Sequence, residues 1–105
     1  MADLQTLDPT LLLASAAAAA RLLRALANEH RLLILCHLVQ GERSVGQLQP
    51  VVGLSQSALS QHLAVLREEG LVATRRESQT IWYRIDDPAA LKVVKTLADI
   101  FCPPN

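Results

Sequence analysis

Two cysteines, Cys36 and Cys102, carry the side chains best suited to covalent chemistry in this sequence. They stand 66 positions apart and form no CxxC motif. A thiolate attacks an oxidised sulfur atom, and a second thiol resolves the product. A single disulfide between such distant cysteines is a poor means of stabilising a fold in a reducing compartment, but it is a reasonable redox switch. We therefore expect these two residues to sense redox chemistry.

The same thiols allow other interpretations, which the sequence leaves open. Cys36 in a buried position can act as a small hydrophobe, and Cys102 can be an unconstrained terminal thiol. The pair can also belong to a soft-metal or metalloid site, although two thiols are an incomplete set for zinc. His30 and His37 have no partner at ligand spacing, so no metal or other cofactor is expected. No catalytic base accompanies either cysteine, so the chain is not expected to be an enzyme.

The composition indicates one small helical domain. The chain has 105 residues, half of them apolar, with only three aromatic residues. The formal net charge is zero, so any preference for nucleic acid must come from local charge. The apolar run 11–20 follows acidic rather than basic residues, unlike a signal peptide, and ten residues are too few to span a bilayer. We expect a cytoplasmic protein with no membrane contact.

Helix-capping residues divide the chain into short elements. Asp8, Asn28, Ser44, Ser55 and Asp87 each precede a segment with helical apolar periodicity. Residues 71–86 are rich in Val, Ile, Thr, Trp and Tyr around a polar centre, which predicts a β-hairpin. The expected helices are 9–27, 30–39, 45–52, 56–69 and 89–101, and the expected strands are 71–76 and 81–86.

The two ends of the chain have separate predicted roles. Residues 1–8 are expected to form a flexible arm, and residues 9–105 a single domain. The alanine run 16–20 favours helix and lets another helix approach closely, so we expect the first helix to pack in a dimer. Packing within the domain is the alternative. At the other end, Phe101 is expected to anchor the last helix in its own apolar stripe.

A DNA-binding unit follows from this order of elements. A short helix, a turn containing glycine and a second helix form a helix-turn-helix, and the hairpin after it forms a wing. The fold class is therefore mainly α with a β-hairpin wing, a winged helix-turn-helix of order α-α-α-α-β-β-α. Short polar side chains at the start of the second helix suit base edges and phosphates, and basic or polar wing residues suit phosphates or a minor groove. The expected DNA-binding residues are Ser55, Gln56, Ser57, Ser60, Gln61, His62, Arg75, Arg76, Gln79 and Thr80, with Arg84 also on the wing.

Three stretches, LANEHRLLILCHL, VGLSQSALSQHLAVLREEGLV and RRESQTIWYRI, together resemble the ArsR/SmtB family of winged-helix repressors. The resemblance covers about residues 20–102 and is most specific over 54–72. It implies a homodimer with the first and last helices at its interface. Such a dimer would bind an imperfect palindrome in an operator, because two-fold symmetry supplies two half-sites.

The resemblance also indicates which kind of chemical signal the protein senses. The arsenic-type motif of the family falls on residues 42–48, where Ser44 and Gly46 replace both cysteines. The zinc-type site of the last helix is absent too, because residues 89–101 contain no histidine and a single acid. The placement of Cys36 and Cys102 instead resembles the dithiol subgroup that responds to reactive sulfur species. By this analogy, persulfide or polysulfide would link the two cysteines and release operator DNA.

Overall fold

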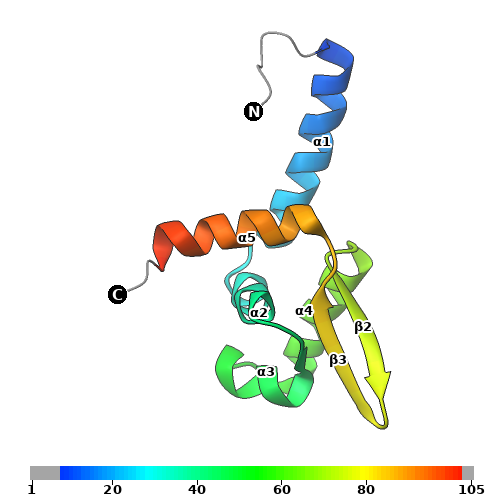
Figure 1. The fold of residues 1–105 in the computed structure, drawn as a ribbon, viewed down its shortest axis with the longest axis vertical. Coiled ribbons are helices and arrows are strands. Elements are labelled where there is room, and N and C mark those ends of the chain that lie inside the picture. The colour runs from blue at the N-terminus through cyan, green and yellow to red at the C-terminus, as the bar shows by residue number, and fades with distance from the viewer. Residues whose placement is uncertain (1–7, 103–105) are drawn as a thin grey trace.

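The computed structural model describes residues 8–102, which form five helices and three strands (Figure 1). The predicted arm, residues 1–8, lies outside the described residues except for Asp8. The order of elements confirms the predicted fold class, with one short strand added. The elements are α1 (Pro9–Leu26), α2 (Glu29–Val39), β1 (Arg43–Ser44), α3 (Val45–Val52), α4 (Gln56–Glu68), β2 (Val72–Glu77), β3 (Thr80–Ile85) and α5 (Pro88–Phe101).

The five predicted caps begin the five helices. The side chains of Asp8, Asn28 and Asp87 accept hydrogen bonds from backbone N–H groups of the first helical turn. Ser44 forms a full capping box, because its hydroxyl accepts from the N–H of Gln47 and the Gln47 side chain accepts from the N–H of Ser44. Ser55 caps α4 through the N–H of Ala58. These contacts fix where each helix starts, including the two of the helix-turn-helix.

The core is aliphatic and joins α2, α3, α4 and α5. Its most buried members come from every one of these helices. The helix-turn-helix packs against α2, and α2 packs in turn against α5. The apolar positions of α4 point inward as its periodicity predicted. The largest fully buried side chains are Ile34, Leu35, Leu48, Leu59, Leu63, Leu66 and Val94.

The sheet contains a strand that the sequence analysis missed. Its order is β1-β3-β2 with antiparallel neighbours, so β3 is central. β1 has only two residues, too few for a recognisable alternation, and Ser44 within it pairs with Trp82. The hairpin loop is also shorter than expected. Glu77 and Thr80 pair with each other, which leaves a two-residue loop in which Ser78 adopts a positive φ of 59°.

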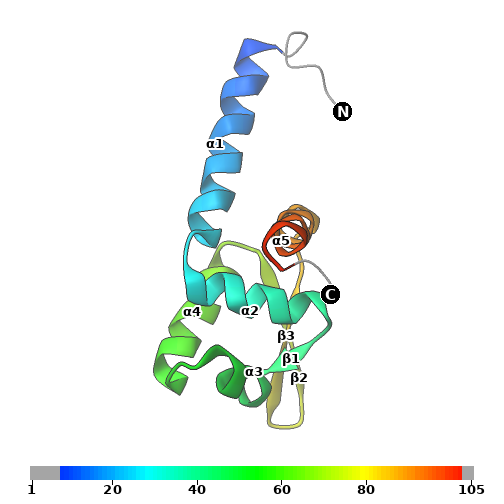
Figure 2. The ribbon, with the colours of Figure 1, turned by 90° about the vertical axis from the view of Figure 1, so that its left-hand side faces the viewer.

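α1 stands away from the rest of the molecule, as Figure 2 shows. Only Ala25 and Leu26 of its 18 residues are buried. By length and composition the whole helix could cross a membrane, with a mean hydropathy of 1.3, so the ten-residue run considered in the sequence understated its apolar length. C-terminal to that run, the helix carries Arg21. The Arg21 Nε lies 2.8 Å from Oε2 of Glu69, the residue that follows α4.

The expected anchoring by Phe101 was wrong. Its side chain is 75% exposed at the end of α5, and Ile100 beside it is 61% exposed. α5 crosses α2 (Figures 1 and 2), with Val94 and Ala90 buried, whereas the side chains of Ile100 and Phe101 in its last turn stay exposed. The chain therefore presents apolar side chains on both α1 and α5.

Candidate nucleic-acid interface and thiol site

The exposed face of α4 carries the predicted polar stripe. Ser57, Ser60 and Gln61 are spaced three and four apart, and all three are exposed on the face opposite the buried leucines. Gln56 is exposed as well. Ser55 uses its hydroxyl oxygen to accept from the Ala58 N–H at 3.1 Å, which leaves its O–H free to donate. The helix thus presents hydrogen-bonding groups without a competing acidic residue in its first turn.

His62 lies in a different setting from its neighbours on α4. It is half-buried, and its ring centroid is 5.6 Å from that of His30 on α2. Burial chiefly, and then the positive charges of Arg31 and His30, lower the pKa of His62. From the sequence, His30 was expected only to lack a partner at metal-ligand spacing. The contact was not visible in the sequence because the two histidines lie on separate helices.

The wing arginines differ in their surroundings. The Arg75 Nε lies 2.8 Å from Glu42 Oε1, and its Nη1 lies 2.7 Å from Glu77 Oε2. Arg84 lies 3.9 Å from Asp86. Arg76 donates to the backbone oxygen of Ser78 and has no acidic partner among residues 8–102. Arg76 is therefore the wing cation most available to an external anion.

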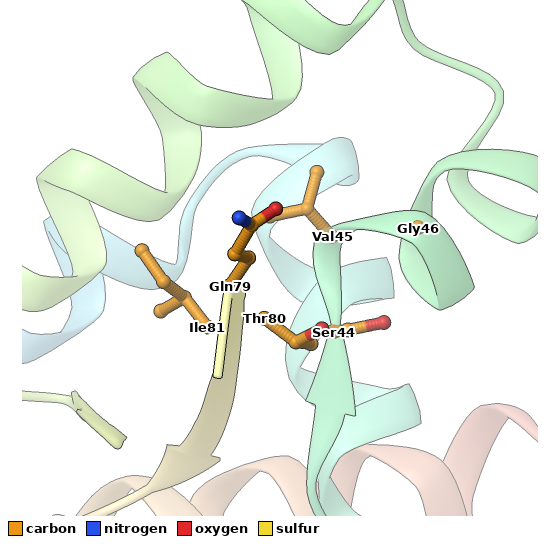
Figure 3. A pocket seen from close by; sticks show the side chains of 6 residues that line it. All are labelled: Ser44, Val45, Gly46, Gln79, Thr80 and Ile81. Carbon is orange, nitrogen blue, oxygen red and sulfur yellow. The ribbon is translucent and has the colours of Figure 1, made fainter. Parts of the chain in front are cut away.

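The wing tip faces the start of α3 across a hollow of 340 Å³. Figure 3 shows Gln79, Thr80 and Ile81 on one side of this hollow and the segment from Ser44 to Gly46 on the other. Gln79 and Thr80 are both exposed. The wing tip and the start of the helix-turn-helix therefore lie close enough to contact one molecule together.

The two cysteines line one hollow between α2 and α5, with a volume of 460 Å³. Cys36 is half-buried on α2, Cys102 is exposed at the end of α5, and both are free thiols. Lys95 and Asp99 of α5 line the same hollow. Residues 66 positions apart in the sequence thus share one solvent-accessible site.

The environment of Cys36 disfavours its thiolate. Burial chiefly, and then the nearby charge of Cys102, raise the pKa of the Cys36 thiol. A higher pKa leaves less thiolate at neutral pH and slows nucleophilic attack. Among residues 8–102, no group of three or more His, Cys, Asp or Glu side chains is arranged to hold a metal ion. The hollow therefore offers thiol chemistry on two sulfur atoms.

This fold and this exposed helix define a class of protein, the DNA-binding winged-helix transcriptional regulators. Residues 28–74 match the family model for bacterial regulatory proteins of the arsR family. The chain is 48% identical over 91 residues to the transcriptional activator HlyU of Vibrio cholerae, covering 87% of this chain and 84% of that protein. It is 47% identical to the biofilm growth-associated repressor of Xylella fastidiosa, over 79% of this chain and 73% of that one. The chain belongs to the arsR family of transcriptional regulators.

Solved structures agree with this assignment. Reduced HlyU from Vibrio cholerae superposes with a TM-score of 0.84 at 47% identity, covering 87% of this chain and 96% of that one. The transcriptional repressor BigR from Xylella fastidiosa gives a TM-score of 0.83 at 42% identity, covering 91% and 98%. The relatives are named as transcriptional regulators and not as enzymes.

Proposed function

We propose that this protein is a cytoplasmic, homodimeric repressor that releases operator DNA when reactive sulfur species link Cys36 to Cys102. The observation that carries the proposal is the shared hollow between α2 and α5, which both cysteines line. The resemblance of the chain to the dithiol subgroup supports the same chemistry. Residues 1–8 would form a flexible arm, and residues 9–105 one DNA-binding and dimerisation domain.

The proposed linkage proceeds in two balanced steps. Cys102 is the more exposed thiol, so its thiolate attacks the outer sulfur of a persulfide RSSH, forming a Cys102 persulfide and releasing RS⁻. The Cys36 thiolate then attacks the Cys102 sulfur, forming the Cys36–Cys102 bond and releasing HS⁻. Two cysteine thiols lose two electrons, and the outer sulfur of the persulfide leaves as sulfide. If a second persulfide has first converted Cys36 to a persulfide, attack of its outer sulfur on the Cys102 sulfur releases HS⁻ and leaves a three-sulfur bridge.

DNA contacts in this proposal come from α4 and the wing tip. Ser55, Gln56, Ser57, Ser60 and Gln61 supply donors and acceptors to base edges and phosphates in a major groove. Arg76, Gln79 and Thr80 reach an adjacent phosphate or minor groove from the wing. His62 lies at the edge of this surface, because its ring contacts His30. An imperfect palindrome matches the two copies of the unit in a homodimer.

The dimer interface in this proposal is formed by α1 and α5. Both helices expose large apolar side chains that a stable soluble protein normally covers. α1 has few contacts with the rest of its own chain, which is the arrangement expected of a helix that packs against a second copy. The exposed apolar residues on these helices include Leu11, Leu13, Leu23, Ile100 and Phe101.

The decisive experiment combines DNA binding with intact mass. Reduced protein selects a duplex from a random library, and the affinity for that duplex is measured before and after treatment with glutathione persulfide. We expect a loss of affinity that follows the appearance of an intramolecular link and is reversed by dithiothreitol. Cys36→Ser and Cys102→Ser variants should bind the duplex and should not respond. An unchanged affinity in the linked protein, or an equal response of the serine variants, would overturn the proposal.

A further inference from the structure

Arg75 lies on the outer face of the wing in a network of four side chains. Its Nε donates to both carboxylate oxygens of Glu42, at 2.8 and 2.9 Å, and its Nη1 donates to Glu77 at 2.7 Å. Its guanidinium carbon lies 5.5 Å from the ring centroid of Trp82. Pairing with two different carboxylates while lying over an aromatic face is a set of contacts for which a planar guanidinium is suited and an ammonium is not.

The strand register explains why these side chains meet. Arg75 pairs directly with Trp82 across β2 and β3, so both point to the same face of the sheet. Glu77 lies two residues beyond Arg75 and points to that face too. Ser44 of β1 pairs with Trp82 from the other side. The Trp82 Nε1 is buried there without a hydrogen-bond partner among the described residues, so packing and the Arg75 guanidinium hold the indole in place.

Glu42 connects this network to the helix-turn-helix. It precedes β1 and lies two residues before Ser44, which begins α3 through its capping box. The Arg75–Glu42 pair therefore bridges 33 positions and joins β2 to the start of α3. β1 itself contributes only two paired residues, and this ion pair adds a second connection between the wing and the segment that begins α3.

We propose that Arg75 is a positioning residue that fixes the wing relative to α3 through Glu42, and that it does not bind DNA phosphates. This inference rests on the DNA-binding part of the proposed function and is independent of sulfur sensing. Together, Glu42, Glu77 and Arg75 carry a net charge of −1, so the network as a whole does not attract a phosphate. Direct phosphate binding by Arg75 would require it to leave both carboxylates.

The direction in which Glu42→Gln changes DNA affinity shows whether Arg75 positions the wing or binds phosphates. Glu42→Gln removes a negative charge, and if Arg75 bound phosphates the variant would free it and bind DNA more tightly. If Arg75 positions the wing, the same change loosens the wing and weakens binding, by about two- to fivefold for a partly exposed pair. Glu68→Gln is the matched control, because it removes one exposed acid that belongs to no ion pair among residues 8–102.

The experiment measures affinity for the duplex selected by the reduced wild-type protein, at several salt concentrations. We expect Glu42→Gln and Arg75→Gln to weaken binding by similar factors, and their effects to be non-additive in the double variant. Arg75→Gln should leave the slope of log K against log salt unchanged, whereas Arg76→Gln should reduce its magnitude by about one. Tighter binding by Glu42→Gln, or a reduced slope for Arg75→Gln, would overturn the inference.

Trp82 supplies a readout that needs no DNA. It is the only tryptophan in the chain, and the Arg75 guanidinium lies over its ring. Glu42→Gln should increase quenching of its fluorescence by acrylamide, and Glu68→Gln should not. Equal quenching in both variants would show that the Arg75 network does not fix the position of the wing. A failure of the wild-type protein to select any duplex would instead count against the proposed function, so the two failures are distinguishable.

Discussion

A bond between Cys36 and Cys102 should stabilise the protein against unfolding while weakening its binding to DNA. The bond would close a loop of the chain that contains β1, α3, α4 and the wing, since the two cysteines lie in α2 and at the end of α5. Closing this loop restricts the unfolded chain much more than the folded one, in which both residues already line the same hollow. Loss of DNA binding would then arise from a change of geometry and not from unfolding.

The size of the effect follows from the length of the loop. For cysteines 66 positions apart, loop-closure entropy gives a stabilisation of about 4 kcal/mol at 25 °C, reduced by any strain in the folded state. Additional sulfur atoms in the bridge barely change this figure, because the entropy depends on the logarithm of the loop length. The stabilisation therefore tests whether a link forms, and intact mass counts the sulfur atoms in it.

Urea denaturation of the linked and reduced proteins at equal concentration measures the difference. Equal concentration is needed because association contributes to the apparent stability of a dimer. Cys102→Ser, treated identically with the persulfide, is the matched control and should show no gain. The unfolding midpoint of the linked protein should rise, and reduction should return it to the midpoint of the untreated protein.

Two results would refute the reasoning. A linked protein less stable than the reduced one would show that the hollow cannot accept the bond without disrupting the fold, and the loss of DNA binding would then be simple damage. A link between subunits, seen as a covalent dimer on a non-reducing gel, would show that the two thiols of one chain do not react with each other.

Three further outcomes follow from the structure. Ser57→Ala and Gln61→Ala should each reduce discrimination between the selected duplex and a scrambled one by about 1–3 kcal/mol, measured by competition binding; unchanged discrimination would show that α4 does not contact base edges. Because the folded state lowers the pKa of His62, the unfolded chain binds more protons as pH falls through about 6.5, and stability should decrease below that pH; thermal unfolding of His62→Gln should show less of this acid sensitivity. Replacing Leu13 and Phe101, each 75% exposed, by serine should shift the sedimentation coefficient toward the monomer; an unchanged dimer would place the interface elsewhere.

Local signals in the sequence account for most of the fold. The five caps predicted the five helix starts because each is a contact between residues two or three positions apart, which composition and spacing reveal. β1 was missed because its two residues have no pattern of their own and become a strand only by pairing with β3. Phe101 was misplaced because periodicity shows which residues share a face but not how far a neighbouring helix extends.

In the candidate site, too, local features could be predicted from the sequence and tertiary contacts could not. Sequence reasoning found the polar stripe of α4 because it depends on helical spacing alone. It also named both cysteines, and the structure places them at one hollow. It found neither the contact between His30 and His62 nor the one between Glu42 and Arg75, since each joins elements that only the tertiary fold brings together.

α2 is the element through which a bond at the thiol site would act on DNA binding. Cys36 lies toward the end of α2 that meets α5, and His30 at its beginning contacts His62 of α4. Between them Ile34 and Leu35 are fully buried, so a displacement of α2 would be carried to α4 by close packing.

α1 is connected to both α2 and α4. The Arg31 Nε on α2 donates to the Ala25 carbonyl at 2.6 Å near the end of α1, and Arg21 of α1 pairs with Glu69 beyond the end of α4. In the proposed dimer α1 sets the spacing of the two subunits, and α4 reads the two half-sites. A bond that draws α5 toward α2 would therefore alter the relative placement of two recognition helices that a palindrome must match at once. Under the proposed function, a small change at Cys36 would release DNA in this way without contacting it.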